Sequence, residues 1–176
     1  MRYLIALPLL KNESESFIKL RDQYKDTAPK WKITLGPHIT LFRPSEFLLD
    51  KNKAIELFEK APKFGKFQEE FEVFSAFMNH SNNAVYSEPK NYDNFKKLKK
   101  SYMGTASKIM QDTSEVWPFH PHLTLVNRLD SEPAKGLLLK LKSADFKKNY
   151  TFDRVSLYKK EHQDSEWVEI AHNALT

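Results

Sequence analysis

A pentapeptide occurs twice in this chain, as PHITL at residues 37–41 and as PHLTL at residues 121–125. Four of its five positions are identical, and the fifth exchanges Ile for Leu. Apolar residues alternate with His and Thr in both copies, which is typical of a strand whose side chains point to opposite faces in turn. His38 and Thr40 are therefore expected to share one face, as are His122 and Thr124. The Ile and Leu residues between and after them should pack behind.

The distance between the two copies indicates a duplicated unit. Positions 38 and 122 are 84 residues apart in a chain of 176. Each copy is preceded by a predicted helix and followed by a helix and two strands. This order of elements predicts an α+β fold of two pseudo-symmetric halves, approximately residues 1–89 and 90–176, within a single domain. A pseudo-two-fold axis would bring the two motif strands together and place the histidines on either side of one groove.

Apolar periodicity and turn residues place the remaining elements. Strands are expected at residues 2–9, 71–78, 84–87, 151–159 and 166–171, in addition to the two motif strands. Helices are expected after Ser14 and Asp50, which serve as N-cap residues, over residues 92–110, and from Ser131. In the strand at 71–78, alternate residues should face opposite sides of the sheet. One side would carry Phe71, Val73, Ser75 and Phe77, and the other Glu72, Phe74, Ala76 and Met78.

Composition narrows the class of protein. Hydrophobic residues make up 40% of the chain, which favours a folded globule over disorder. The absence of Cys excludes disulfides, thiolate nucleophiles and cysteine-ligated zinc. No apolar run is long enough for a transmembrane helix, and the N-terminal segment lacks a small-residue cleavage site. We expect a cytoplasmic monomer that does not associate with membranes.

The charge balance favours an anionic ligand without identifying it. Lys and Arg number 28 against 23 Asp and Glu, and the pI is about 9.2. Such an excess is compatible with phosphate or RNA as a partner. The lysine runs, at residues 96–100, 147–148 and 159–160, are expected to be solvated helix faces and turns.

The two His/Thr pairs suit acid–base chemistry on a phosphate. Imidazole has a pKa of about 6.5, so one ring can be neutral while the other is protonated. A neutral His can accept a proton from water or a ribose hydroxyl, and a protonated one can donate to the departing oxygen. Thr hydroxyls on the same face can bind the phosphate oxygens. Base and acid on opposite sides of phosphorus suit in-line displacement, and this scheme requires neither metal nor cofactor.

The paired HxTx motif of residues 38–41 and 122–125 resembles that of the two-histidine (2H) phosphoesterases, and most closely the 2′-5′ RNA ligase/cyclic phosphodiesterase branch. The resemblance implies a bilobal α+β fold in which antiparallel sheets form a V-shaped groove, with helices on the outside. It also implies metal-independent cleavage of phosphodiesters with a 2′ linkage. The implied substrates are RNA with a 2′,3′-cyclic phosphate end or small nucleotide cyclic phosphates, with 2′-5′ linkages and the reverse ligation as variants.

Two arginines are candidates for binding the substrate. Members of this branch often have an Arg shortly after the second motif, where this chain has Asn127 followed by Arg128. Arg43 stands after the first motif. A surface role is the alternative for both arginines.

Aromatic residues could stack on a nucleobase. Phe42 lies two residues after Thr40, so regular alternation puts it on the motif face. Tyr158 and Trp117 are further candidates. Core packing is the alternative for all three.

Two other functions stay open. His120 and His122 could chelate zinc and serve a metal-dependent hydrolase, although Pro121 separates them and no carboxylate cluster accompanies them; we therefore expect no metal site. The second is a non-catalytic module that binds RNA or nucleotides on the same scaffold. The other histidines, His80, His162 and His172, are expected to be exposed.

Overall fold

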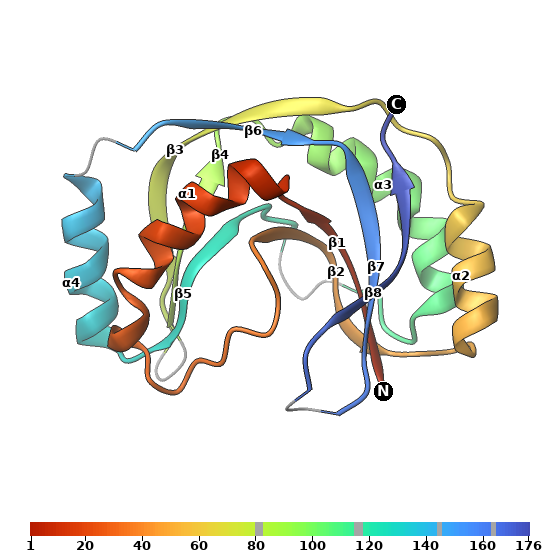
Figure 1. The fold of residues 1–176 in the computed structure, drawn as a ribbon, viewed down its shortest axis with the longest axis horizontal. Helices are drawn as coiled ribbons and strands as arrows, with labels where there is room; N and C mark the ends of the chain where they lie inside the picture. The colour runs from red at the N-terminus through yellow and green to blue at the C-terminus, as the bar shows by residue number, and fades with distance from the viewer. Residues whose placement is uncertain (80–82, 115–117, 144–145, 163–164) are drawn as a thin grey trace.

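The computed structural model describes residues 1–79, 83–114, 118–143, 146–162 and 165–176. Within these ranges the chain forms eight strands, four α-helices and one short 3-10 helix (Figure 1). The strands are β1 (Arg2–Pro8), β2 (His38–Glu46), β3 (Phe67–Phe77), β4 (Asn83–Pro89), β5 (Leu123–Leu129), β6 (Lys148–Phe152), β7 (Arg154–Lys160) and β8 (Val168–Ala174). The helices are α1 (Lys11–Asp22), η1 (Lys25–Thr27), α2 (Lys51–Glu59), α3 (Asp93–Ile109) and α4 (Ser131–Lys142).

The strands form one antiparallel sheet in the order β6-β3-β4-β5-β2-β1-β7-β8. Its two central strands, β2 and β5, are the motif strands, and among the described residues they are paired only through Ile39 and Leu123. The joint between β2 and β5 divides the sheet into two halves of four strands each, and the ribbon curves into an arch (Figure 1). The predicted α+β fold is therefore confirmed, and the antiparallel sheets expected for the two lobes are halves of one sheet that meet at the motif strands.

The chain crosses from one lobe to the other near the C-terminus. Sequence patterning predicts one strand over residues 151–159, and this prediction is wrong. The segment is divided at Asp153 into β6, which pairs with β3 in one lobe, and β7, which pairs with β1 in the other. Asp153 lies in neither strand, so the chain passes from one lobe to the other at this residue.

Two helices also connect the lobes. Helix α1 follows β1 along the chain but packs against β5 of the other lobe. Helix α3 follows β4 and packs against β2. Helix α4 covers β3 and β4, and α2 packs on α3 and β8 at the opposite end of the arch (Figure 1). The first and second halves of the sequence thus do not correspond to two separate bodies.

The local helix signals are confirmed in part. Helix α3 buries the apolar face predicted for it, including Phe95, Leu98 and Tyr102. The Asp50 carboxylate accepts hydrogen bonds from the amides of Asn52 and Lys53 and so caps α2. Ser14 does not cap α1, because this helix begins one turn earlier, at Lys11.

Strand β3 departs from simple alternation. Phe71 pairs with Pro89 and Val73 with Glu88, so the register shifts between them. Phe71 and Phe74 are both buried, whereas Val73 is exposed. The prediction that Val73 shares a face with Phe71 is wrong because this bulge reverses the direction of the following side chains.

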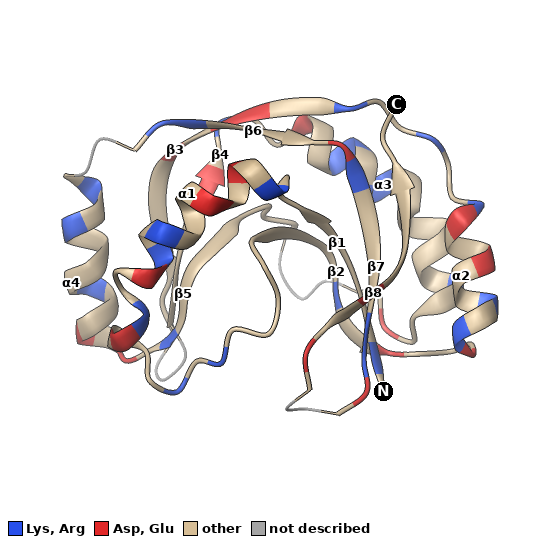
Figure 2. Cartoon of the chain, viewed as in Figure 1, with Lys and Arg blue, Asp and Glu red and all other residues tan. Residues whose placement is uncertain are grey.

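Lys and Arg as well as Asp and Glu residues are spread along the outer elements (Figure 2). The predicted solvated lysine runs are exposed at Lys96, Lys97, Lys100, Lys147 and Lys148, whereas Lys159 and Lys160 are half-buried. Lys99 is an exception. It is buried, its ammonium donates to the Leu41 carbonyl, and it lies 4.4 Å from the ring centroid of Phe42. Among the described residues, no helix combines the length and hydropathy required to cross a bilayer.

Candidate active site

The pairing of the motif strands gathers the two His/Thr pairs. Ile39 lies opposite Leu123, and both are fully buried. Extending this antiparallel register by one residue places His38 across from Thr124 and Thr40 across from His122. These four side chains therefore share the sheet face opposite to that of Ile39 and Leu123, as alternation predicts.

Each histidine is held by the carbonyl two residues before it. His38 Nδ1 lies 2.7 Å from the Gly36 oxygen, and His122 Nδ1 lies 2.7 Å from the His120 oxygen. Because a carbonyl can only accept, Nδ1 carries the hydrogen in both rings. The Nε2 of both rings is left to exchange a proton with a ligand. The Pro that opens each pentapeptide fixes the backbone between carbonyl and imidazole, which gives this residue of the motif a physical role.

The protein disfavours the charged form of both rings. The pKa of His122 is lowered to about 4, chiefly by burial and also by the charges of His120 and His38, while the His120 carbonyl and Glu88 act in the opposite direction. Burial also lowers the pKa of His38, and the charge of Arg21 adds to this effect. Both imidazoles are thus mainly neutral at pH 7 in the ligand-free protein.

The repeat extends from the motif to the pairing of the strands around it. In each lobe the motif strand has one extra residue directly after the Thr, Leu41 in β2 and Leu125 in β5, and a second one before Ser45 in β2 and before Leu129 in β5. The pairs that show this are Leu7–Ile39, Ala6–Thr40, Ile5–Phe42 and Tyr3–Ser45 in one lobe, and Ser87–Leu123, Tyr86–Thr124, Val85–Val126 and Asn83–Leu129 in the other. Every member on the motif strand is offset by 84 residues.

The first of these irregularities corrects the prediction for Phe42. A regular strand would turn its ring to the face of Thr40, but the extra residue Leu41 turns it into the core. Phe42 is 1% exposed, as is fitting for the counterpart of buried Val126. Phe42 therefore packs in the core and does not face a ligand, which is the alternative stated for it from the sequence.

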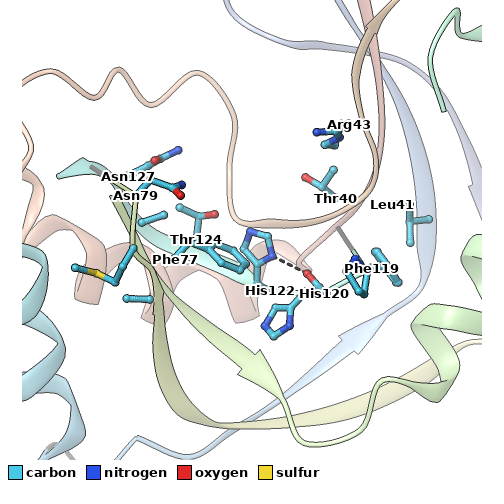
Figure 3. A pocket seen from close by; sticks show the side chains of 14 residues that line it. Thr40, Leu41, Arg43, Phe77, Asn79, Phe119, His120, His122, Thr124 and Asn127 are labelled. Carbon is cyan, nitrogen blue, oxygen red and sulfur yellow. Dashed lines mark hydrogen bonds between the residues drawn. The ribbon is translucent and has the colours of Figure 1, made fainter. Parts of the chain in front are cut away.

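Next along each strand come Arg43 and Asn127, which are equivalent by the same offset. Both line one cavity of about 620 Å³ together with Thr40, His122 and Thr124 (Figure 3). The Arg43 guanidinium also donates to the Ser114 carbonyl, over 3.2 Å. Asn127 was not among the residues expected at the site.

Arg128, a predicted substrate contact, lies outside this cavity. It has a φ of 59°, a left-handed conformation that turns it away from the strand, and its guanidinium donates to the Lys30 carbonyl. The first extra residue of β5, Leu125, thus brings Asn127 to the cavity in place of Arg128. The surface alternative applies to Arg128.

Aromatic rings form one wall of the cavity beside His122. The ring centroids of Phe77 and Tyr86 each lie 5.0 Å from that of His122. Phe119 lines the cavity from the segment that leads to β5 (Figure 3). His38 is not among the lining residues and approaches the site from the other motif strand. Neither Phe77 nor Phe119 was expected at the site from the sequence; Phe77 comes close to His122 only through the pairing of β4 with both β3 and β5.

The other aromatic and histidine candidates lie apart. Tyr158 is 5% exposed and packs against Leu4 and Ala6. Trp117, His80 and part of the turn predicted at 81–83 lie outside the described residues. His162 and His172 are exposed, as expected, and His172 Nδ1 lies 3.1 Å from a Glu169 carboxylate oxygen.

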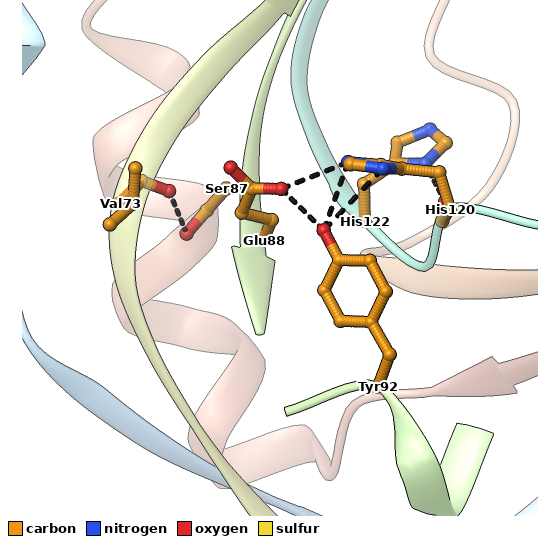
Figure 4. Close-up of polar contacts among 6 residues, drawn as sticks. All are labelled: Val73, Ser87, Glu88, Tyr92, His120 and His122. Atoms are coloured by element: carbon orange, nitrogen blue, oxygen red, sulfur yellow. Dashed lines mark hydrogen bonds and ion pairs between the residues drawn. The ribbon is translucent and has the colours of Figure 1, made fainter. Parts of the chain in front are cut away.

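His120 has a defined set of partners (Figure 4). Its Nε2 lies 3.0 Å from Glu88 Oε2, and the Tyr92 hydroxyl donates to the same carboxylate oxygen. Burial and Glu88 raise the pKa of Tyr92, which keeps its hydroxyl protonated. Within the described residues no group of three or more His, Asp or Glu side chains could hold a metal ion, so the zinc alternative has no third ligand there.

A family model described as the 2′-5′ RNA ligase superfamily matches residues 12–164, a range that includes both motifs. The chain belongs to this family. Membership of the 2′-5′ RNA ligase superfamily confirms the resemblance to the 2H phosphoesterases and supports an enzyme that acts on phosphodiester bonds. No curated protein matches the chain.

Solved structures show the same fold at low sequence identity. E. coli LigT in its apo form is 16% identical, with a TM-score of 0.67, over 99% of this chain and 97% of that one. LigT complexed with 3′-AMP is 16% identical with a TM-score of 0.68, over 99% and 98%. TT0787 of Thermus thermophilus is 16% identical with a TM-score of 0.62, over 99% and 98%. The arch is therefore a fold that this chain shares with LigT and TT0787.

Proposed function

We propose that this member of the 2′-5′ RNA ligase superfamily is a phosphodiesterase that opens 2′,3′-cyclic phosphates of RNA ends or nucleotides without a metal ion. The observation that supports this proposal most is that His38 and His122 have the same hydrogen-bonding arrangement. Both donate Nδ1–H to a carbonyl, both leave Nε2 for chemistry, and each has the Thr of the opposite strand across from it.

In the proposed reaction, one neutral Nε2 accepts a proton from water as the water oxygen bonds to phosphorus. The bond from phosphorus to one ribose oxygen breaks, and the protonated Nε2 of the other histidine donates its proton to that oxygen. Thr40 and Thr124 bind the remaining phosphate oxygens. An approximate two-fold axis through the Ile39–Leu123 pair would place the two rings on opposite sides of phosphorus. Attack by a 5′-hydroxyl in place of water, with the same proton transfers, would give ligation instead of hydrolysis.

The cavity beside His122 supports a nucleotide as the substrate. Arg43 provides a positive charge, Asn127 a hydrogen-bonding amide, and Phe77 an aromatic surface. A structure of the related LigT contains 3′-AMP, which shows a nucleotide bound by this fold in that protein.

The test is an assay of purified protein with nucleoside 2′,3′-cyclic phosphates, RNA with a cyclic phosphate end, ADP-ribose 1″,2″-cyclic phosphate and 2′-5′ oligoadenylate. We expect turnover of at least one of these that survives EDTA and falls by about 10³-fold or more in His38→Ala and in His122→Ala. Full activity in either variant would overturn the mechanism, and loss with EDTA would overturn metal independence. Binding without turnover by the wild type would favour the non-catalytic module.

A further inference from the structure

Arg21 is a buried cation with no anionic partner in the part of the chain that the structure describes. Arg21 lies on α1 and is only 7% exposed. Its Nε has no hydrogen-bond partner, and no carboxylate of the described residues forms an ion pair with the guanidinium. The neighbouring Asp22 acts on it only through its charge. A guanidinium stays charged in proteins, and a buried charge is costly unless it is paired. This arrangement calls for an anion from outside the chain.

A second cavity gives such an anion room. It has a volume of about 320 Å³ and is lined by Arg21, Thr34, Gly36 and Trp167, together with Ile33 and Leu35. The Trp167 amide donates to the Thr34 carbonyl over 3.1 Å, which fixes the two walls to each other. Glu166 also lines the cavity, but its side chain is exposed and forms no ion pair with Arg21.

This cavity adjoins the His38 side of the site. Gly36, in its wall, supplies the carbonyl that holds His38 Nδ1, and the charge of Arg21 acts on the same imidazole. A Cβ added at Gly36 would meet no atom within 4 Å. The equivalent position beside His122, 84 residues on, is His120, which lines the larger cavity with its side chain. Space is therefore open beside one histidine and occupied beside the other.

We propose that the Arg21 cavity binds a second phosphate group of the substrate, next to the phosphate on which the two histidines act. The guanidinium can bind two phosphate oxygens at once, and the Thr34 hydroxyl can donate to a third. The proposal rests on the proposed function and narrows its substrate class to nucleotides or RNA ends that carry two phosphates. The second phosphate is either a terminal monoester or the internal diester of RNA.

The kinetic test compares three substrates: adenosine 2′,3′-cyclic phosphate, its 5′-phosphorylated form, and a diadenosine with a 2′,3′-cyclic phosphate end. The variants are Arg21→Gln, Arg21→Lys and the matched control Lys19→Gln, which removes an exposed charge from the same helix. We expect Arg21→Gln to lower kcat/KM about tenfold or more on one or both substrates with two phosphates, and less than twofold on the first. The kcat/KM of Arg21→Lys on these substrates should lie between those of the wild type and Arg21→Gln, and that of Lys19→Gln should equal the wild-type value.

A binding test does not depend on turnover. Adenosine 3′,5′-bisphosphate should raise the melting temperature of the wild type and of Lys19→Gln more than adenosine 3′-phosphate does. Arg21→Gln should lose this difference. Equal effects of Arg21→Gln on all three substrates and both ligands, or no effect at all, would overturn the proposal. If no substrate is turned over by the wild type, the proposed function fails, while the melting temperatures still decide whether the second phosphate is bound.

Discussion

At the scale of single residues, the state of the two imidazoles sets the expected pH dependence. Acid–base catalysis requires one neutral and one protonated ring, and this arrangement is most populated between their two pKa values. Both pKa values lie below 6.5, and that of His122 is about 4. We therefore expect kcat/KM, which reports the free enzyme, to peak below pH 6.5 and to fall towards neutrality. A pH–rate profile of the wild type on a cyclic nucleotide measures this.

The profile of kcat should peak at higher pH than that of kcat/KM, because the bound phosphate anion favours the imidazolium. NMR titration of the two rings in the free protein provides an independent check. A kcat/KM maximum above pH 7 would contradict the expectation.

The partners of His120 provide a second test at this scale. Glu88 holds the His120 side chain, and the His120 carbonyl holds His122. Glu88→Gln should lower kcat about tenfold with little change in KM, because Glu88 positions the ring without contacting the substrate. It should also move the kcat/KM maximum to lower pH, since the Glu88 charge is one cause that raises the pKa of His122.

Two control variants accompany Glu88→Gln. Tyr92→Phe keeps the Glu88–His120 pair and should lower kcat less than Glu88→Gln does. Glu56→Gln, an exposed carboxylate on α2, should have none. An unchanged pH profile in Glu88→Gln would show that the pair has only a structural role.

At the scale of elements, the extra residues in β2 and β5 decide which side chains reach the cavity. Alternation predicts the shared face of His38, Thr40, His122 and Thr124 correctly, because these residues precede the first extra residue of each strand. It fails for Phe42, which follows the extra residue of β2, and Arg128, a candidate from the family resemblance, lies beyond the extra residue of β5. No glycine marks either position, so the bulges appear only when the partner strands are paired. Alternation thus places the residues up to the Thr of each motif. Beyond it, Arg43 lines the cavity as its place after the motif suggests, whereas Phe42, Asn127 and Arg128 could not be placed from the sequence.

The equivalence of Arg43 and Asn127 predicts the result of an exchange. Arg43→Asn should lower kcat/KM about tenfold on an anionic substrate, since it removes a charged hydrogen-bond donor from the cavity. The double variant Arg43→Asn/Asn127→Arg restores one guanidinium at the equivalent position and should recover at least about threefold of this loss. Steady-state kinetics measure both. A double variant no better than Arg43→Asn would show that the two positions are not functionally equivalent.

At the scale of the whole molecule, the crossing at Asp153 makes the lobes depend on each other. An apolar, β-prone run on both sides of this residue is indistinguishable from one long strand in the sequence, and only the pairing partners of β6 and β7 separate them. The duplicated order of elements nonetheless predicts the bilobal fold, because each half supplies one motif strand.

This interlocking predicts a single unfolding transition. Phe152→Ala in β6 and Leu157→Ala in β7 each remove a fully buried side chain and should each cost about 2–5 kcal/mol in the free energy of unfolding. Both should shift the same transition in urea, followed by circular dichroism and by tryptophan fluorescence. Leu139→Ala, at an exposed position of α4, should shift it little. Two separated transitions in either core variant would show that the lobes unfold independently.

The sparse joint between β2 and β5 has a further consequence. Among the described residues, Ile39 and Leu123 alone pair these strands, and the two histidines stand beside that joint on different halves of the sheet. A phosphate held by both histidines would act as a second bridge across it. A bound ligand would then slow amide hydrogen exchange in β2 and β5 near Ile39 and Leu123 more than within either lobe, because the ligand would connect the two lobes.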